Sequence, residues 1–353
     1  MFFDWLTVGG FLCGALAGGA ARFGRLCTMS AVEDALVGRD FRGAKAWGLA
    51  LAIAIAATQT VSALGWIDLS RTLYAAPRLH LLGTMLGGMV FGLGMTLVGT
   101  CSFGLLIRAG GGDLRAAVSA MLVGIFAIAM TAGVLSPMRE ALLNWGVITF
   151  PSHAGPSMLD MLDRVLGRGT SQALVAAGLG TLVAVAVFDR RLRKRPRLLG
   201  GSVVLGLAIA SSWLVTSRAV DALVLDRPES LSFVAPVGRA LLQFMMEPFR
   251  NAAFGVATAF GAVVASFVVA AWRRELRWEA FDDATEMRRH LFGGALMGIG
   301  GVLAQGCTIG QGMTAASTLA LSAPIFIASV LLGAKLGLAH LIDGRSLWRL
   351  GRA

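Results

Sequence analysis

Two glycine-rich stretches that each end in a cysteine motif carry the residue types that could do chemistry in this chain. The first is Gly87–Gly104 (GGMVFGLGMTLVGTCSFG) and the second is Gly293–Gly310 (GGALMGIGGVLAQGCTIG). A shift of 206 positions places seven of the eighteen residues on identical ones without a gap, and it superimposes Cys101 on Cys307. The repetition predicts an internal duplication in which an apolar helix runs to a cysteine and then breaks.

A third cysteine, Cys27, stands in the weakly apolar front of the segment 22–45, whose back is charged. Each of the three cysteines is followed by a hydroxyl residue: Thr28, Ser102 and Thr308. Thiols and hydroxyls are hydrogen-bond donors, and the polarisable thiol suits an anion that itself contains sulfur. We expect these six side chains to contact such an anion, with neutral thiols because thiolates would repel it. The alternative is that the cysteines are small buried apolar residues, which is our expectation for Cys13.

The helix breaks themselves favour anion binding. A half-helix that begins at a break directs its N–H groups and its positive dipole end inward. Two such ends facing each other across a pseudo-twofold axis would make an anion site with few charged residues. Gly104 and Gly310 close the two motifs, while Gln305 and Gln311 flank Cys307, where they would orient a ligand or cap the broken helix.

Two other kinds of chemistry compete with anion binding. Cysteine and methionine are ligands for Cu(I), and five methionines lie near the motifs: Met85, Met89, Met95, Met297 and Met313. However, the chain has no CxxC or HxxxH pair in the motifs and no acidic residue there, so we expect no metal and no cofactor. The second alternative is a membrane thiol-redox enzyme in which Cys101 and Cys307 cycle through a disulfide. No catalytic triad or nucleotide-binding loop is recognisable.

The elements that must position these residues are membrane helices. The chain of 353 residues is 56% hydrophobic and only 14% charged, with a mean hydropathy of +0.73. Apolar runs long enough to cross a bilayer, about 20 residues each, recur along it. The sequence therefore predicts an all-α polytopic membrane protein with about nine transmembrane helices, at 5–21, 44–65, 80–105, 112–136, 171–188, 199–217, 250–271, 291–310 and 318–342.

The basic residues are distributed unevenly between the two sides that these spans define. One side holds 21 lysines and arginines and the other holds nine, with Lys335 inside a span. Because an excess of Lys and Arg marks the cytoplasmic face, we expect the N-terminus outside and the C-terminus inside. The net charge of +11 is thus an orientation signal and does not indicate a nucleic-acid partner. The loop Arg190–Pro196 (RRLRKRP) is expected to touch anionic lipid.

The count of spans decides how the two copies are oriented. The span 171–188 has no counterpart under the shift, and a single extra crossing between two four-span halves turns the second half upside down. We therefore expect an inverted repeat, which places binding sites near the bilayer midplane. The expected units are a first membrane repeat at 1–136, an outer segment with a linking helix at 137–198, and a second, inverted repeat at 199–353.

The motifs resemble the YeeE/YedE family of sulfur-transport membrane proteins. The resemblance is carried by RFGRLCTMSAVEDALVGRDFRGAKAW and LFGGALMGIGGVLAQGCTIGQGMTAASTLAL together with the first glycine-cysteine motif, and it covers most of the chain. It implies short re-entrant helices and a thiosulfate path lined by Cys27, Cys101 and Cys307, along which S–H···S contacts hand on the anion without covalent turnover. It thus implies inward transport of thiosulfate, or of a closely related small sulfur anion, and no enzyme activity.

The resemblance also implies a location. We expect a multi-pass protein of the bacterial inner membrane, surrounded by the lipid bilayer, with a cytoplasmic sulfur-carrier protein as a candidate partner at the basic face. Members of the family differ in cargo, and some are assigned to selenium metabolism or to sulfane-sulfur relay. Transport of a selenium species therefore stays open as an alternative.

Overall fold

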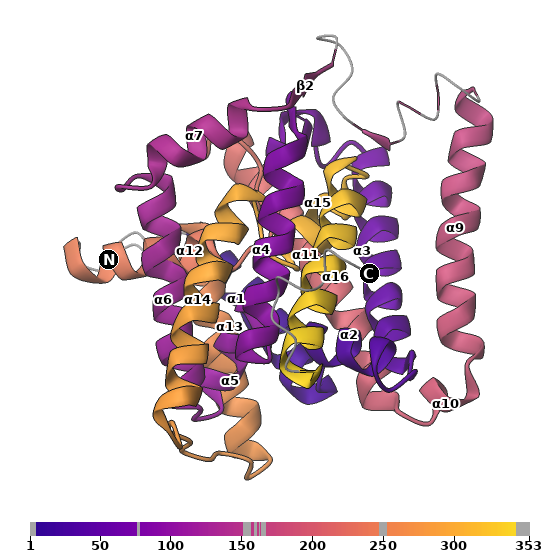
Figure 1. Cartoon of the computed structure of the whole chain (residues 1–353). Coiled ribbons are helices and arrows are strands. Elements are labelled where there is room, and N and C mark those ends of the chain that lie inside the picture. Colours follow the sequence, from indigo (N-terminus) through magenta and orange to yellow (C-terminus); the bar gives the residue numbers. More distant parts are fainter. Residues whose placement is uncertain are drawn as a thin grey trace.

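The computed structural model describes residues 5–75, 78–150, 157–158, 161, 163, 167–246 and 253–343. These residues form a bundle of helices (Figure 1). The helices are α1 (Trp5–Gly24), α2 (Thr28–Leu36), α3 (Arg42–Ala63), α4 (Leu81–Val98), α5 (Ser102–Gly110), α6 (Leu114–Thr131), α7 (Ser136–Asn144), α9 (Arg168–Phe188), α10 (Arg190–Arg193), α11 (Pro196–Asp221), α12 (Ala235–Met246), α13 (Phe254–Trp272), α14 (Ala284–Leu303), α15 (Ala315–Ser317) and α16 (Ser322–Asp343).

Shorter elements connect these helices. The 3-10 turns η1 (Leu69–Arg71) and η2 (Leu73–Ala75) follow α3, and the π-helical turn η3 (Gly310–Thr314) precedes α15. Two strands of three residues each, β1 (Arg78–His80) and β2 (Val147–Thr149), pair antiparallel with Leu79 opposite Ile148.

Seven helical segments among the described residues are long and apolar enough to cross a membrane. They are Trp5–Leu36, Arg42–Ala63, Leu81–Gly110, Leu114–Thr131, Pro196–Asp221, Phe254–Trp272 and Ser322–Ile342. These apolar helical segments fit the expected all-α polytopic membrane protein. Two further spans were expected where α9 and α14 lie: α9 has a shorter apolar part, Ala173–Phe188, and α14 begins with the polar residues ATEMRRH.

The two glycine-cysteine motifs pack against each other, because α4 and α14 run antiparallel in close contact. A Cβ atom at Gly87 would lie 2.7 Å from the carbonyl oxygen of Gly300, and one at Gly94 would lie 2.6 Å from that of Gly293. Only glycine permits this approach of two backbones, which is how small residues drive helix association in membranes. The glycines of the motifs are therefore the contact surface of the two central helices.

Other helices surround this central pair. The opposite face of α4 packs on α16, where a Cβ at Gly92 would meet the carbonyl of Val330 at 2.3 Å, and α14 packs on α6, where one at Gly298 would meet that of Val123 at 2.7 Å. A second group comprises α1, α3, α11 and α13. In contrast, α9 stands at the edge of the bundle beside α3 (Figure 1).

The segments with the basic excess meet at one end of the bundle, which we call the basic end. Lys45 forms an ion pair with Asp189 there, and Arg115 forms one with Glu279. The backbone of Leu114 also bonds to that of Glu279 at 2.9 Å. Strands β1 and β2 lie at the opposite end (Figure 1). Part of the expected outer segment 137–170 and the start of the expected span 250–271 lie outside the described residues.

Candidate functional site

A residue with a left-handed backbone stands two positions before each of the three candidate cysteines. These residues are Arg25 (φ 53°), Gly99 (φ 78°) and Gln305 (φ 61°), and they end α1, α4 and α14. A left-handed residue ends a helix because it turns the chain away from the helical path. Gly99 and Gln305 coincide under the 206-residue shift, so both copies of the motif break in the same way. The third break, at Arg25, has the same left-handed backbone geometry but lies outside the duplicated motif.

Cys27 and Cys101 occupy the N-cap positions of α2 and α5, in extended backbone conformation, and neither caps its helix with its side chain. The two residues are connected by a crossed pair of contacts. The Cys101 sulfur lies 3.6 Å from the hydroxyl of Thr28, and the Cys27 sulfur lies 3.8 Å from the hydroxyl of Thr100. The starts of two half-helices, one from each of two distant segments, therefore form one cluster of thiols and hydroxyls.

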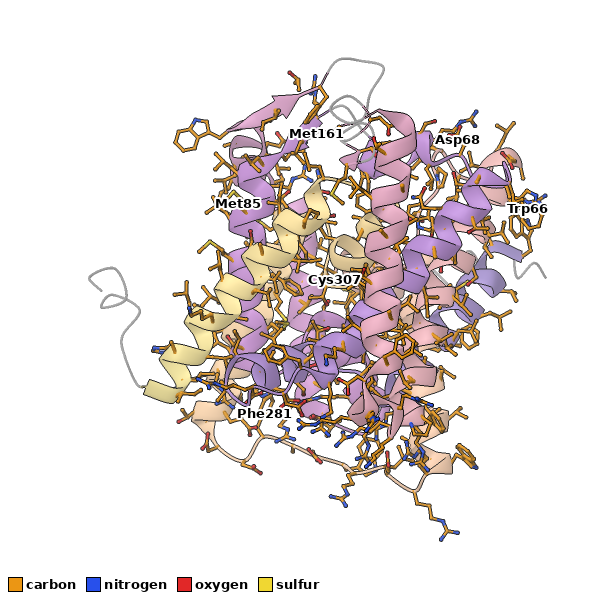
Figure 2. All side chains as sticks on the ribbon, turned by 90° about the vertical axis from the view of Figure 1, so that its right-hand side faces the viewer. Trp66, Asp68, Met85, Met161, Phe281 and Cys307 are labelled. Atoms are coloured by element: carbon orange, nitrogen blue, oxygen red, sulfur yellow. The ribbon has the colours of Figure 1, made fainter. Side chains whose placement is uncertain are left out.

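Cys307 lies beyond the end of α14 and is fully buried. The backbone N–H of Gly310 donates to its sulfur at 3.4 Å, and the next residue, Thr308, lines a cavity together with Thr28. Cys27 and Cys101 are thus joined by the contacts of Thr28 and Thr100, and Cys307 adjoins Thr308, which faces the same cavity as Thr28. Figure 2 shows Cys307 in the middle of the bundle, with nitrogen-bearing side chains gathered at the end near Phe281.

Three buried polar atoms at the motifs have no hydrogen-bond partner among the described residues. They are Ser102 Oγ, Thr308 Oγ1 and Gln311 Oε1, in side chains that are 2%, 6% and 1% exposed. An unsatisfied buried polar group costs about 1–3 kcal/mol, so three of them around two thiols fit a site that a polar ligand completes. The amide of Gln311 can turn to present either its oxygen or its NH₂ group.

The predicted glycines make room within the same site. A Cβ atom at Gly104 would lie 2.0 Å from the hydroxyl of Thr100, and one at Gly310 would lie 2.7 Å from the hydroxyl of Ser232. Gln305 is half-buried at the break of α14, where its backbone ends the helix. Cys13 lies elsewhere, buried in α1 with its sulfur 3.6 Å from Ser211 Oγ, which matches the expected core residue.

A cavity of 380 Å³ opens from this cluster toward the basic end. Its lining includes Cys27, Thr100 and Gly104 together with four charged side chains: Arg22, Arg25, Arg108 and Glu275. None of these charged residues is in the set predicted from the sequence. The sequence contains one hint of their role, because Arg25 and Arg108 stand close to Cys27 and Cys101 in the chain. A count of basic residues on each side of the membrane does not distinguish these two arginines from the other arginines in loops.

The opposite end of the site is covered by hydrogen bonds. The hydroxyl of Tyr74 donates to the carbonyl of Gly310 at 3.0 Å, and Trp213 Nε1 donates to Ser317 Oγ at 3.0 Å. Gln59 Nε2 donates to the backbone carbonyl of Ser317 at 2.9 Å. Burial raises the pKa of Tyr74, so this phenol is a neutral donor. One signal for this cover is present in the sequence, since Tyr74 is the only tyrosine in the chain.

The arrangement can bind a small anion through neutral donors inside the bundle. Thiols, hydroxyls and the N–H groups of broken helices offer hydrogen bonds, while three arginines in the lining of the adjoining cavity supply positive charge. No group of three or more metal-ligating His, Cys, Asp or Glu residues lies together in the part of the chain that the structure describes.

Comparisons with known proteins agree with this chemistry. A family model described as "Sulphur transport" matches residues 23–336. The chain is 25% identical over 341 residues to the thiosulfate transporter TsuA of Escherichia coli (strain K12), covering 93% of this chain and 92% of that protein. It is 28% identical over 322 residues to the thiosulfate transporter TsuA of Spirochaeta thermophila, covering 89% and 92%. These names indicate a transporter rather than an enzyme, which argues against the thiol-redox alternative.

Proposed function

The chain belongs to the sulphur transport family, and on this premise we propose that it carries thiosulfate, or a closely related small sulfur anion, inward across the bacterial inner membrane. Both curated relatives are named as thiosulfate transporters, and each aligns with about nine tenths of its length. The proposed cargo is a dianion whose terminal sulfur is soft and whose oxygens accept hydrogen bonds. The site described above offers partners for both ends of such an ion.

The observation that carries this proposal is the set of donors that the protein leaves unused. Ser102 and Thr308 each follow a cysteine, and their buried hydroxyls have no partner. A passing oxyanion would supply the missing acceptors, and the adjacent thiols of Cys101 and Cys307 would face its terminal sulfur. Because these groups are neutral, the anion would not be trapped by a strong ion pair, and transport needs no covalent step.

We propose a route in which the anion meets the cysteines in sequence. From the end covered by Tyr74, the anion would meet Cys307 first, then Cys101, and then Cys27, which is joined to Cys101 by the contacts of Thr28 and Thr100. Gln311 would orient the anion beside Cys307, and Gly104 and Gly310 would leave space for it. For Gln305 we propose the other of its two expected roles, which is to end the helix.

The packing of the central helices supports an inverted repeat around this route. Gly87 packs on Gly300 and Gly94 packs on Gly293. The 206-residue shift converts the first of these contacts into the second with the partners exchanged, as a twofold axis in the membrane plane requires. We propose that α9 and α14 add to the seven recognised segments and give nine crossings, with α2 and α5 as re-entrant helices.

The orientation and the further partner are also proposals. The basic end would be cytoplasmic because cytoplasmic loops carry an excess of Lys and Arg; the N-terminus would then be outside and the C-terminus inside. A cytoplasmic sulfur-carrier protein that removes the delivered sulfur species would dock at this end.

Uptake of radiolabelled thiosulfate into proteoliposomes tests the proposed function. Wild-type protein is expected to transport thiosulfate, and Cys101→Ala and Cys307→Ala are expected to lose transport while remaining folded. Cys13→Ser is the matched control, because this cysteine is buried outside the site, and it should transport at the wild-type rate. Normal transport by a variant with serine at both Cys101 and Cys307 would show that the thiols have no role.

A further inference from the structure

The cavity at the basic end has a charge that matches a divalent anion. Three guanidinium groups, those of Arg22, Arg25 and Arg108, and one carboxylate, that of Glu275, line it. The wall therefore carries two net positive charges. The cavity has a volume of 380 Å³, which is room for a small oxyanion with part of its hydration shell. It also reaches the Cys27 side chain, so it is continuous with the cysteine cluster.

Glu275 is shared among three arginines. Its carboxylate lies 3.1 Å from Arg25, 3.5 Å from Arg273 and 3.9 Å from Arg22. Burial acts to raise the pKa of Glu275, but the hydrogen bond from Arg25 and the charges of Arg273 and Arg22 outweigh it and hold the pKa below its usual range. The side chain is thus a carboxylate at neutral pH, and it occupies arginines that a dissolved oxyanion would otherwise bind.

The arginines are held in place but are incompletely satisfied. Arg22 Nη2 also donates to the backbone carbonyl of Glu275 at 3.4 Å, and its guanidinium lies against Gly111, where a Cβ atom would come within 2.6 Å of it. Yet the buried Nε of Arg22 has no partner in the described part of the chain. Arg108 donates to the carbonyl of Gly99 at 3.4 Å and has no ion-pair partner among the described residues.

We propose that this cavity is a second binding site for a small divalent oxyanion, in which Arg22, Arg25 and Arg108 receive the anion beyond Cys27 and Glu275 competes with it for the arginines. This site deepens the proposed function and rests on it for the identity of the anion. The effect of this competition on anion release follows from the charges. Three free arginines would hold a dianion tightly, whereas an internal carboxylate that returns to the arginines displaces the anion and promotes its release into solution.

The charge of the cavity can be measured without any transport assay, because Cys27 is half-buried and lines the wall. Purified full-length protein is treated with an anionic methanethiosulfonate reagent or with its cationic counterpart of similar size. Peptide mass spectrometry then reports the rate of modification at Cys27. The wild-type protein is expected to react about three- to tenfold faster with the anionic reagent. A single charge close to a partly exposed site changes the interaction energy of a charged reagent there by about 1 kcal/mol. Added sodium sulfate, a dianion that does not react with these reagents, should protect Cys27.

Two opposite substitutions provide the decisive comparison. Glu275→Gln should raise the anionic-to-cationic rate ratio severalfold, and Arg108→Gln should lower it severalfold, while Arg108→Lys should preserve it. Equal rates for both reagents in the wild-type protein, or a ratio that neither substitution moves, would overturn the proposal. A purely structural role for the ion pairs predicts altered melting temperatures with an unchanged ratio, so it also counts against the proposal.

Transport kinetics separate this inference from the proposed function. In proteoliposomes, Glu275→Gln should lower both KM and the maximal rate for thiosulfate, because tighter holding slows release, and Arg108→Gln should raise KM. If the wild-type protein takes up no thiosulfate while the labelling ratio and anion protection behave as expected, the proposed transport fails and the anion site stands. If transport is normal and the ratio is one in all variants, the site fails and the transport function stands.

Discussion

The hydroxyl of Thr28 lies 3.6 Å from the sulfur of Cys101, although 73 positions separate the two residues in the chain. The reciprocal contact joins Cys27 to Thr100. Each half-helix therefore begins beside the cysteine of the other, so a donor from one segment and a thiol from the other face the same space. These crossed contacts connect the segment with Cys27 and Thr28, which lies outside the duplicated motif, to the first motif. A substitution at Thr28 therefore tests the proposed route.

Thr28→Val should reduce thiosulfate uptake about tenfold or more, because it removes one hydroxyl at the thiol cluster, and a hydrogen bond to a charged group contributes about 1.5–3 kcal/mol. The melting temperature should change little, since valine has nearly the same shape. Thr28→Ser restores the hydroxyl and should restore uptake. Equal uptake by the valine variant and the wild-type protein would exclude the hydroxyl from the route.

Gly94→Ala should destabilise the protein by about 1–3 kcal/mol, the usual cost of forcing an extra methyl group into a packed contact. The added Cβ would lie 2.6 Å from the carbonyl of Gly293. Gly180→Ala in α9 is the matched control, because no atom lies within 4 Å of its Cβ position, and alanine favours the helix. Thermal unfolding in detergent measures both. Similar stability for the two variants would contradict the close packing of α4 on α14.

Gln305→Gly should leave uptake within about twofold of the wild-type rate. The backbone at Gln305 is left-handed, with φ 61°, which costs a side-chain-bearing residue about 1–2 kcal/mol and costs glycine almost nothing. We therefore expect unchanged or raised thermal stability. Gln311→Ala should reduce uptake in the same assay, because this buried amide has an unpaired oxygen at the site. A severe loss of uptake in stable Gln305→Gly protein would instead assign ligand binding to Gln305.

Tyr74→Phe should expose Cys307 to small thiol reagents. The substitution keeps the ring against Trp213 but removes the hydrogen bond to the carbonyl of Gly310. That carbonyl then lacks its donor, which weakens the cover by about 1–3 kcal/mol. Modification of Cys307 by N-ethylmaleimide, followed by peptide mass spectrometry, should be severalfold faster than in the wild-type protein. An unchanged rate would mean that Tyr74 does not close the site.

Glu229→Gln should stabilise the protein at pH 7. Burial raises the pKa of Glu229 above its ordinary value, although Arg239 and Arg227 act in the opposite direction. The folded state therefore binds the proton more tightly than the unfolded state, and its stability falls as the pH rises through the window above 4.5. The difference in melting temperature between the variant and the wild-type protein should shrink as the pH is lowered to about 4. A difference independent of pH would contradict this assignment.

The sequence by itself determined the class of fold and predicted the residues at the centre of the candidate site. Membrane helices can be located from composition because each must satisfy its own backbone hydrogen bonds in lipid, and the helices α1, α3, α4, α6, α11 and α16 lie where the apolar runs predicted them. The duplicated motif identified Cys101 and Cys307 because repetition of a rare residue at a break is a local signal. Cys27 was singled out because a hydroxyl residue follows it, as in the two motifs, and the resemblance implied a path lined by all three cysteines.

Only the tertiary structure decided which groups meet. The contact of Thr28 with Cys101, the cover made by Tyr74 and the sharing of Glu275 among arginines all join segments that are far apart in the chain. Local pattern cannot encode such pairs, because it fixes the length and polarity of a helix but not its neighbours. The left-handed turn at Gln305 was also hidden, since it occurs at a residue type that rarely adopts that conformation. The packing of one backbone on another, glycine against glycine, brings these separate breaks to one place.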